Sequence, residues 1–191
     1  LVGTSFSNRY QTDAYQVAGA LSFALGAAVE NFSVTGGGLV GAMEAFVQSG
    51  ALDTGQFETV VWETPYTSPL TQVAGLRQVL GALDNDVSAI PLYAGRLTDD
   101  WQIVKLKTVI VPGGTLRIET PGIDVGQLSV ELFSPDGEKV RLKLRKSERV
   151  EKNQRSDIWQ VSLLALPLAE VSRIKLKLDT VAHAARVSLL N

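Results

Sequence analysis

The sequence has no cysteine among its 191 residues and a single histidine, His183. Without a thiol, the chain cannot carry a cysteine nucleophile, a disulfide bond or a cysteine-ligated zinc ion. No apolar run approaches the roughly 20 residues that a membrane helix needs, so we expect no membrane span. Hydrophobic residues make up 45% of the chain and charged residues 20%. This composition is typical of a globular protein and excludes a disordered or collagen-like chain.

Charge is distributed unevenly along the chain. Residues 1–85 contain two basic and seven acidic residues, for a net charge of −5. Residues 86–191 contain 16 basic and 13 acidic residues, for a net charge of +3. Because the sign and the texture of the sequence both change at this point, we predict one domain over residues 1–85 and a second over residues 86–191.

The first 65 residues alternate short apolar runs with helical patterns. The runs predict buried strands and the patterns predict helices, in the order strand 1–2, helix 15–25, strand 29–34, helix 39–48 and strand 59–62. This alternation is typical of a parallel α/β sheet with flanking helices. The first strand has only two residues, whereas an ordinary strand has about five or six. We therefore expect the polypeptide to be the C-terminal part of a longer protein.

The texture changes after a predicted bridging helix over residues 70–83. Seven segments alternate apolar and polar residues with period two and are separated by turn sequences rich in proline and glycine. They cover residues 103–111, 115–119, 128–134, 139–144, 158–164, 173–178 and 186–190. The predicted fold class is thus a partial α/β parallel sheet followed by an all-β sandwich or jelly roll.

A candidate nucleophile lies in the turn Gly3-Thr4-Ser5, directly after the first predicted strand. Reactive groups of α/β proteins lie at the carboxyl edge of the sheet, where this turn is expected. A serine there, beside backbone N–H groups, can act as a nucleophile with part of an oxyanion hole. An isolated Gly-x-Ser sequence is equally compatible with a simple turn or a helix cap.

Several segments together resemble one family. They are Leu1–Ser7, Gly19–Ala27, Val29–Phe32, the Gly36–Gly38 loop and Val60–Pro65, in this order. They are similar to the SGNH-hydrolase-like domain of the alginate O-acetyltransferases, the AlgX and AlgJ type. The later half is similar, in order and texture, to the carbohydrate-binding β-domain that follows in the AlgX type.

The resemblance implies that Ser5 is the acyl-accepting nucleophile. In the family, an Asp-x-His motif upstream of this serine completes the triad, and no such motif occurs in the 191 residues. His183 is the only histidine, and it lies near the end of the predicted β-domain, where a surface or loop role is the simpler interpretation. A serine hydroxyl without a general base is a poor nucleophile at neutral pH. We therefore expect little acetyl transfer by this chain alone.

Three further residues of the first half are candidates for the substrate-binding site. Gly36 and Gly37 follow a predicted strand, where glycine lets backbone N–H groups approach a ligand, although a plain tight turn explains them as well. The loop lacks the Gly-Lys-Ser/Thr ending of a phosphate loop. Tyr66 follows the third predicted strand and could contact a sugar or pack at the domain junction.

The predicted β-domain carries cations at alternate positions. Side chains two residues apart lie on one face of a strand. If the strands are neighbours, these cations form a basic sheet face that attracts a polyanion; a solvated face that discourages edge pairing is the alternative. The cations are Lys105, Lys107, Lys139, Arg141, Lys143, Arg145, Arg173, Lys175 and Lys177.

Nucleic acid is a poor candidate for this polyanion, because the chain is acidic overall and has no recognition-helix or RNA-binding motif. An acidic polysaccharide such as polymannuronate fits better. Sugars bind aromatic faces near hydrogen-bond donors, and Arg96, Trp101 and Lys105 form the best such cluster in the sequence, with Trp159 the second candidate. Either tryptophan could instead belong to the core.

These observations lead to one functional hypothesis and two alternatives. The resemblance implies a periplasmic polysaccharide O-acetyltransferase that uses no metal or other cofactor and takes acetyl groups from a donor protein or molecule. Proteins of the polysaccharide-secretion machinery are further candidate partners. The alternatives are a non-catalytic module that binds acidic polysaccharide or a partner protein, and a carbohydrate esterase, since hydrolysis and transfer share one triad.

Overall fold

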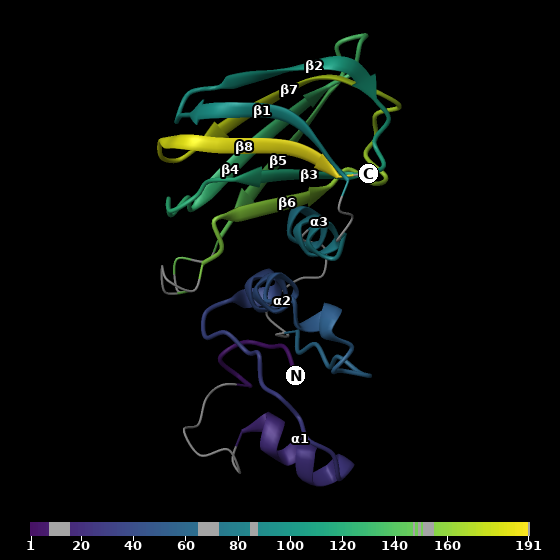
Figure 1. Ribbon diagram of the computed structural model, residues 1–191, viewed down its shortest axis with the longest axis vertical. Helices are drawn as coiled ribbons and strands as arrows, with labels where there is room; N and C mark the ends of the chain where they lie inside the picture. Colours follow the sequence, from purple (N-terminus) through teal and green to yellow (C-terminus); the bar gives the residue numbers. More distant parts are fainter. Residues whose placement is uncertain are drawn as a thin grey trace. The chain divides into compact units, whose positions relative to one another are not determined.

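The computed structural model describes residues 1–7, 16–64, 73–84, 88–146, 148, 150 and 155–190. The chain forms two compact units (Figure 1). Unit 1 comprises Leu1–Gln72 and Lys146–Arg155, and unit 2 comprises Val73–Arg145 and Ser156–Asn191. No helix among the described residues is long and apolar enough to cross a membrane. The domain boundary that we expect near residue 85 remains a prediction.

Unit 1 does not contain the predicted parallel sheet, and the predicted α/β fold class is wrong. The described part of this unit has one parallel bridge, between Val2 and Trp62. The segment over residues 29–34 runs beside it through two backbone hydrogen bonds, from Phe32 N to Leu1 O at 2.8 Å and from Val34 N to Gly3 O at 2.9 Å. A parallel sheet needs layers that cover both of its faces. Val61 is 41% exposed, so these segments remain extended chain without forming a covered sheet.

The described residues of unit 1 form the helices α1 (Val17–Leu25) and α2 (Gly38–Gln48) and the 3₁₀ helix η2 (Ala51–Thr54). The predicted end of α1 at Gly26 is confirmed, since this glycine has a φ of 62°. Two large apolar side chains of α1 are exposed in the described chain, Phe23 at 93% and Leu25 at 64%. By contrast, α2 buries Phe46, whose ring lies 4.8 Å from that of Phe32 in an edge-to-face contact.

Unit 2 consists of two four-stranded antiparallel sheets and one helix, α3 (Val73–Ala82). The first sheet has the strand order β1-β8-β3-β6 and the second has the order β2-β7-β4-β5. The strands are β1 (Ala89–Leu97), β2 (Gln102–Ile110), β3 (Thr115–Glu119), β4 (Gln127–Phe133), β5 (Lys139–Arg145), β6 (Ile158–Ser162), β7 (Val171–Leu178) and β8 (Ala182–Leu190). Each of the seven segments with period-two alternation overlaps one of these strands.

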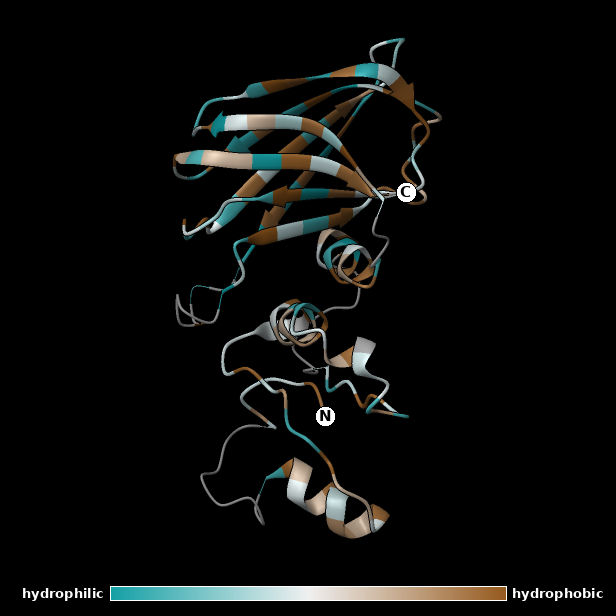
Figure 2. Ribbon diagram, in the orientation of Figure 1, coloured by the Kyte–Doolittle hydropathy of each residue, from teal (hydrophilic) through white to brown (hydrophobic). Residues whose placement is uncertain are grey.

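The core of unit 2 is built from the apolar residues of both sheets. Figure 2 shows apolar residues alternating with polar ones along the strands. Leu116 and Ile118 of β3, Trp159 of β6 and Leu176 of β7 are fully buried. Burying a large apolar side chain stabilises a fold by about 1.5–3 kcal/mol relative to leaving it exposed. Trp159 is therefore a core residue, and it is not the exposed sugar platform that we considered.

Helix α3 packs closely on β6 within unit 2. A Cβ at Gly81 would lie 2.8 Å from the backbone carbon of Gln160, so only glycine allows this approach. The guanidinium of Arg77 donates hydrogen bonds to the carbonyls of Ser162, Leu164 and Ala165, at 3.0, 2.5 and 3.2 Å. The predicted helix over residues 70–83 thus exists, and its first three residues lie outside the described part of the chain.

Candidate functional site

The Gly3-Thr4-Ser5 segment forms a turn that exposes one hydroxyl and buries two. Ser5 is exposed, whereas Thr4 and Ser7 retain only 4% and 1% of their accessible surface. The amide of Ser7 donates a hydrogen bond to the carbonyl of Thr4 at 3.1 Å, which closes the turn. The turn follows the bridge at Val2 directly, so its first residues are held by backbone hydrogen bonds on both sides.

The carboxylate of Glu63 accepts hydrogen bonds from both buried residues of this turn. Its Oε2 accepts hydrogen bonds from the Thr4 amide at 2.9 Å and from Ser7 Oγ at 2.6 Å. Its Oε1 accepts a third from Thr4 Oγ1 at 3.1 Å. Partial burial raises the pKa of Glu63, but the hydrogen bonds from Ser7 and Thr4 outweigh it, and the net pKa is lower than usual. Glu63 is therefore a carboxylate at neutral pH, where each of these bonds is charge-assisted.

Gly3 is the residue that allows Glu63 to approach. A Cβ at this position would lie 2.4 Å from Glu63 Oε2 and 2.9 Å from Ser7 Oγ. Both atoms are fixed by the hydrogen bonds just described, so neither can move without breaking them. Close packing against Glu63 and Ser7 therefore requires glycine at position 3.

The Gly36–Gly38 loop begins beside the serine turn. Val34 donates its amide to Gly3 O, which places the start of the loop next to the segment that carries Ser5. Gly36 has a φ of 80°, which favours glycine, and the Gly37 amide closes a tight turn onto Val34 O at 3.0 Å. A Cβ at Gly37 would lie 3.0 Å from the amide nitrogen of Ala42 in α2. The loop is thus a close-packed turn, and its role in substrate binding remains a prediction.

Unit 1 contains no histidine that could act as a general base for Ser5. The single histidine, His183, is an exposed residue of β8 in unit 2. Among the described residues, no three histidine, cysteine, aspartate or glutamate side chains are grouped so that they could hold a metal ion. Tyr66, the other predicted residue of this region, lies outside the described residues.

The cations of unit 2 are brought together on one face of the sheet β2-β7-β4-β5. One row of cross-strand neighbours joins Lys105, Arg173, Phe133 and Lys139, and the next joins Lys175, Glu131 and Arg141. A third row joins Lys177, Ser129 and Lys143. We call this surface the basic face; its cations are Lys105, Lys139, Arg141, Lys143, Arg145, Arg173, Lys175 and Lys177.

Some cations of the basic face have protein partners. Arg141 donates from Nε to Glu131 Oε1 at 2.9 Å, and its guanidinium lies 5.4 Å from the centre of the Trp101 ring. Glu131 is buried, and Lys139 is its second cation, at 3.8 Å. The guanidinium of Arg173 lies 4.2 Å from the ring centre of Phe133 on the adjacent strand. The contacts of the Phe133 ring with Arg173 and Lys175 could not be predicted from the sequence, because no local pattern links these residues.

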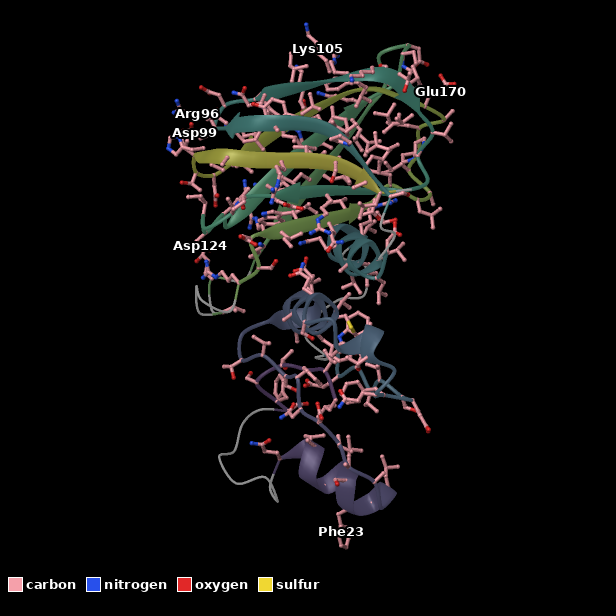
Figure 3. The ribbon with its side chains drawn as sticks, viewed as in Figure 1. Phe23, Arg96, Asp99, Lys105, Asp124 and Glu170 are labelled. Carbon is pink, nitrogen blue, oxygen red and sulfur yellow. The ribbon has the colours of Figure 1, made fainter. Side chains whose placement is uncertain are left out.

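The predicted cluster of Arg96, Trp101 and Lys105 is divided between two sheets. Arg96 belongs to β1, where its carbonyl accepts a hydrogen bond from the Tyr93 hydroxyl at 2.8 Å. Figure 3 shows Arg96 with Asp99 at one end of the strands, whereas Lys105 projects from β2. Trp101 is half-buried and contacts Arg141. The structure therefore pairs Trp101 with the basic face, and a contribution of Arg96 to binding remains a prediction.

Comparison with known proteins finds similarity both in sequence and in structure. Residues 1–66 match the family model "SGNH hydrolase-like domain, acetyltransferase AlgX". The structure is similar to that of AlgX from Pseudomonas aeruginosa, with 20% identity and a TM-score of 0.77 over 98% of this chain. The chain spans only 46% of that protein's length.

A second structural similarity is weak. The structure of Drosophila melanogaster CENP-C bound to CAL1 matches 51% of this chain and 63% of its own, with 14% identity and a TM-score of 0.23. This value is too low to carry any inference about fold or function. No curated protein matches the chain by sequence.

Proposed function

We propose that this chain, whose residues 1–66 match the model of the AlgX-type acetyltransferase domain, is an alginate-related acetyltransferase and that Ser5 is the residue that carries the acetyl group. Ser5 Oγ forms a bond to the acetyl carbonyl carbon of the donor while its proton passes to a general base. The donor's leaving group departs and takes up that proton. A sugar hydroxyl then attacks the acetyl-serine, and its proton returns through the base to Ser5 Oγ as the sugar ester is released.

The observation that carries this proposal is the presentation of Ser5. Its neighbours Thr4 and Ser7 are buried and bonded to Glu63, while Ser5 itself is exposed on a turn of defined backbone. A nucleophile that is held in place loses little orientational freedom when it reacts. The match of the family model covers this turn in full.

The general base is the part of the proposed site that we place outside these 191 residues. His183 lies in the other unit, and the family's Asp-x-His pair has no counterpart in the sequence. The chain alone is then expected to turn over slowly, and the complete enzyme requires polypeptide that supplies the pair.

We place the enzyme in the periplasm, with alginate-type polymer as its acceptor and an acetylated protein or molecule as its donor; the chemistry needs no metal.

The basic face is proposed as the surface that binds the acidic polymer. It gathers eight cations on four neighbouring strands, and Glu131 is the one acidic residue in those described strands. Glu131 is already neutralised by Arg141. The remaining positive charge attracts a polymer that carries one carboxylate per sugar. Trp101, whose ring centre lies 5.4 Å from the Arg141 guanidinium, is the proposed aromatic contact for a sugar at the same surface.

Acetyl transfer to polymannuronate tests the proposed reaction. The donor is p-nitrophenyl acetate, and the readout is ester bound to the polymer after the small molecules have been removed. The protein assayed is a polypeptide that contains this chain together with the Asp-x-His pair. We expect it to transfer acetyl groups, and its Ser5→Ala variant to lose this transfer. The variant Ser22→Ala, which changes a serine of α1, serves as the control and should retain transfer. Equal transfer by Ser5→Ala and the parent would contradict the proposal.

The second candidate is a non-catalytic polysaccharide-binding module. It is favoured by the basic face, which the strands of unit 2 form by themselves. In this case Ser5→Ala would bind polymer as tightly as the parent, and no polypeptide context would produce ester transfer. An esterase differs in its acceptor: it would release acetate from acetylated polymer faster than it transfers acetyl groups to the polymer. A docking role for the polysaccharide-secretion machinery is compatible with each of these.

A further inference from the structure

The side chain of Glu63 accepts hydrogen bonds from the two buried hydroxyls on either side of Ser5. Ser5 lies between Thr4 and Ser7, and both of these donate to the same carboxylate. The backbone of Glu63 is held beside the turn by two hydrogen bonds. The Glu63 amide donates to Val2 O at 2.8 Å, and the Val2 amide donates to Val61 O at 2.9 Å. The backbone immediately before Ser5 and the residue two positions after it are therefore bonded to one group.

These bonds restrict the conformations that the turn can adopt. The Thr4 amide belongs to the Gly3–Thr4 peptide plane, so this hydrogen bond fixes the direction in which the chain enters Thr4, the residue before Ser5. The Ser7 hydroxyl, at 2.6 Å from Oε2, restrains the exit of the turn. Gly3 leaves room for this arrangement, since any larger residue would place a Cβ on Oε2. The hydroxyl of Ser5 is left exposed while the atoms on both sides are restrained.

We propose that Glu63 is the positioning residue of Ser5: it fixes the Gly3–Ser7 turn through Thr4 and Ser7, and thereby sets the direction of the reactive hydroxyl. This inference rests on the proposed role of Ser5 as nucleophile. It assigns no contact between Glu63 and the substrate. A misplacement of about 1 Å at a reacting group can reduce a rate by about 100-fold, which gives the scale of the effect to expect.

Glutamine at position 63 distinguishes geometry from charge. A glutamine oxygen in the place of Oε2 can accept from both the Thr4 amide and the Ser7 hydroxyl. Its NH₂ group, in the place of Oε1, can donate to Thr4 Oγ1, because a hydroxyl is both donor and acceptor. Glu63→Gln therefore preserves all three hydrogen bonds, whereas Glu63→Ala removes them. A positioning role predicts rescue by glutamine.

The first test follows the Thr4 amide by ¹H–¹⁵N NMR in the 191-residue chain. The amide donates directly to Oε2, so we expect its chemical shift to change with pH as the Glu63 carboxylate takes up a proton, with a midpoint below the usual value for glutamate. The midpoint should vanish in Glu63→Gln, and the Thr4 signal should remain dispersed. A Thr4 amide shift that does not titrate in the parent would overturn the inference.

The second test measures the rate at which an alkyl fluorophosphonate labels Ser5, in polypeptide that includes the general base. We expect labelling to fall by about 100-fold in Glu63→Ala and to stay within a few-fold of the parent in Glu63→Gln. Glu58→Ala, which removes an exposed acid of the same unit, is the matched control and should label normally. If Glu63→Ala does not fold, Thr4→Val, which removes the hydroxyl that donates to Oε1 while keeping the side-chain shape, takes its place, with a smaller expected loss.

The outcomes separate this inference from the proposed function. Labelling of Ser5 that survives Glu63→Ala would overturn the positioning role and leave the nucleophile in place. Failure of glutamine to restore labelling, in a folded variant, would also overturn it, because all three hydrogen bonds are retained. If the parent itself does not label at Ser5, both the proposed function and the positioning role are contradicted. Loss in Glu63→Ala with rescue in Glu63→Gln supports both.

Discussion

Arg141 of β5 and Glu131 of β4 are direct cross-strand neighbours, and Arg141 Nε lies 2.9 Å from Glu131 Oε1. The carboxylate is buried, with 6% of its side chain exposed, while the arginine is 58% exposed. A buried charge must be paired to be tolerated. Arg141 therefore stabilises the sheet in addition to contributing to the basic face, and Lys143 is the better position at which to test the proposed binding.

Replacing Arg141 should destabilise unit 2. Arg141→Ala leaves the Glu131 carboxylate with Lys139, whose Nζ lies 3.8 Å from Oε1. We expect a loss of about 1–2 kcal/mol, below the range for a fully buried pair because the arginine is exposed. Urea unfolding measures this loss. Arg145→Ala, at the exposed end of the same strand, is the control and should change stability by less than about 0.5 kcal/mol. Equal stability of both variants would contradict a structural role for Arg141.

Reversing the charge of Lys143 should weaken polymer binding without unfolding the domain. Lys143 is exposed beside Ser129 on the basic face, so Lys143→Glu replaces attraction with repulsion. We expect weaker binding of polymannuronate, measured by titration calorimetry, and a further fall in parent affinity as salt screens the charges. A neutral polysaccharide is the control ligand. Binding that is independent of salt would indicate that the aromatic residues, rather than the cations, carry recognition.

Two glycines of unit 1 should respond to alanine in opposite directions. At Gly3 a Cβ would lie 2.4 Å from Glu63 Oε2, so we expect Gly3→Ala to cost about 1–3 kcal/mol through overpacking. At Gly41, inside α2, a Cβ meets nothing within 4 Å. There we expect a gain of about 0.5–1 kcal/mol from helix propensity. Thermal unfolding of the two variants checks this, and a harmless Gly3→Ala would contradict the close approach of Glu63.

The stability of unit 1 should fall in acid because of Glu63. The pKa of its carboxyl is lower in the folded chain than the usual 4.5, so the folded state binds this proton less readily than the unfolded state. The resulting stability is fully present above about pH 4.5 and is lost as the pH falls through the lower, folded value. Urea unfolding between pH 6 and pH 3 should show a shallower decline in Glu63→Gln than in the parent. Parallel declines would contradict the assignment.

The strands of unit 2 were predictable because half-buried antiparallel strands leave a period-two pattern. Residues 115–119 were predicted as a strand with the observed bounds of β3. Strand β1 was missed, since Pro91 and Gly95 interrupt its alternation and coincide with register shifts against β8. Proline is compatible with β1 because this strand lies at the edge of its sheet.

The fold of unit 1 could not be predicted in the same way. A short apolar run such as residues 29–34 is compatible with a strand in a covered sheet and with an isolated extended segment, and only the surrounding layers decide between them. The role of Glu63 was also beyond the sequence. Its partners Thr4 and Ser7 are 59 and 56 residues away, and no local pattern links them. Ser5 itself was identified through resemblance, whereas the group that holds it required the structure.

Acetylation of Ser5 is the central claim, and mass spectrometry of the protein after brief exposure to an activated acetyl donor tests it most directly. The polypeptide should include the general base, and the reaction should be quenched in acid before the acyl group is transferred. We predict one added acetyl group, located to the peptide that contains Ser5 and absent from Ser5→Ala. An acetyl group on another residue, or turnover that continues in Ser5→Ala, would contradict the account.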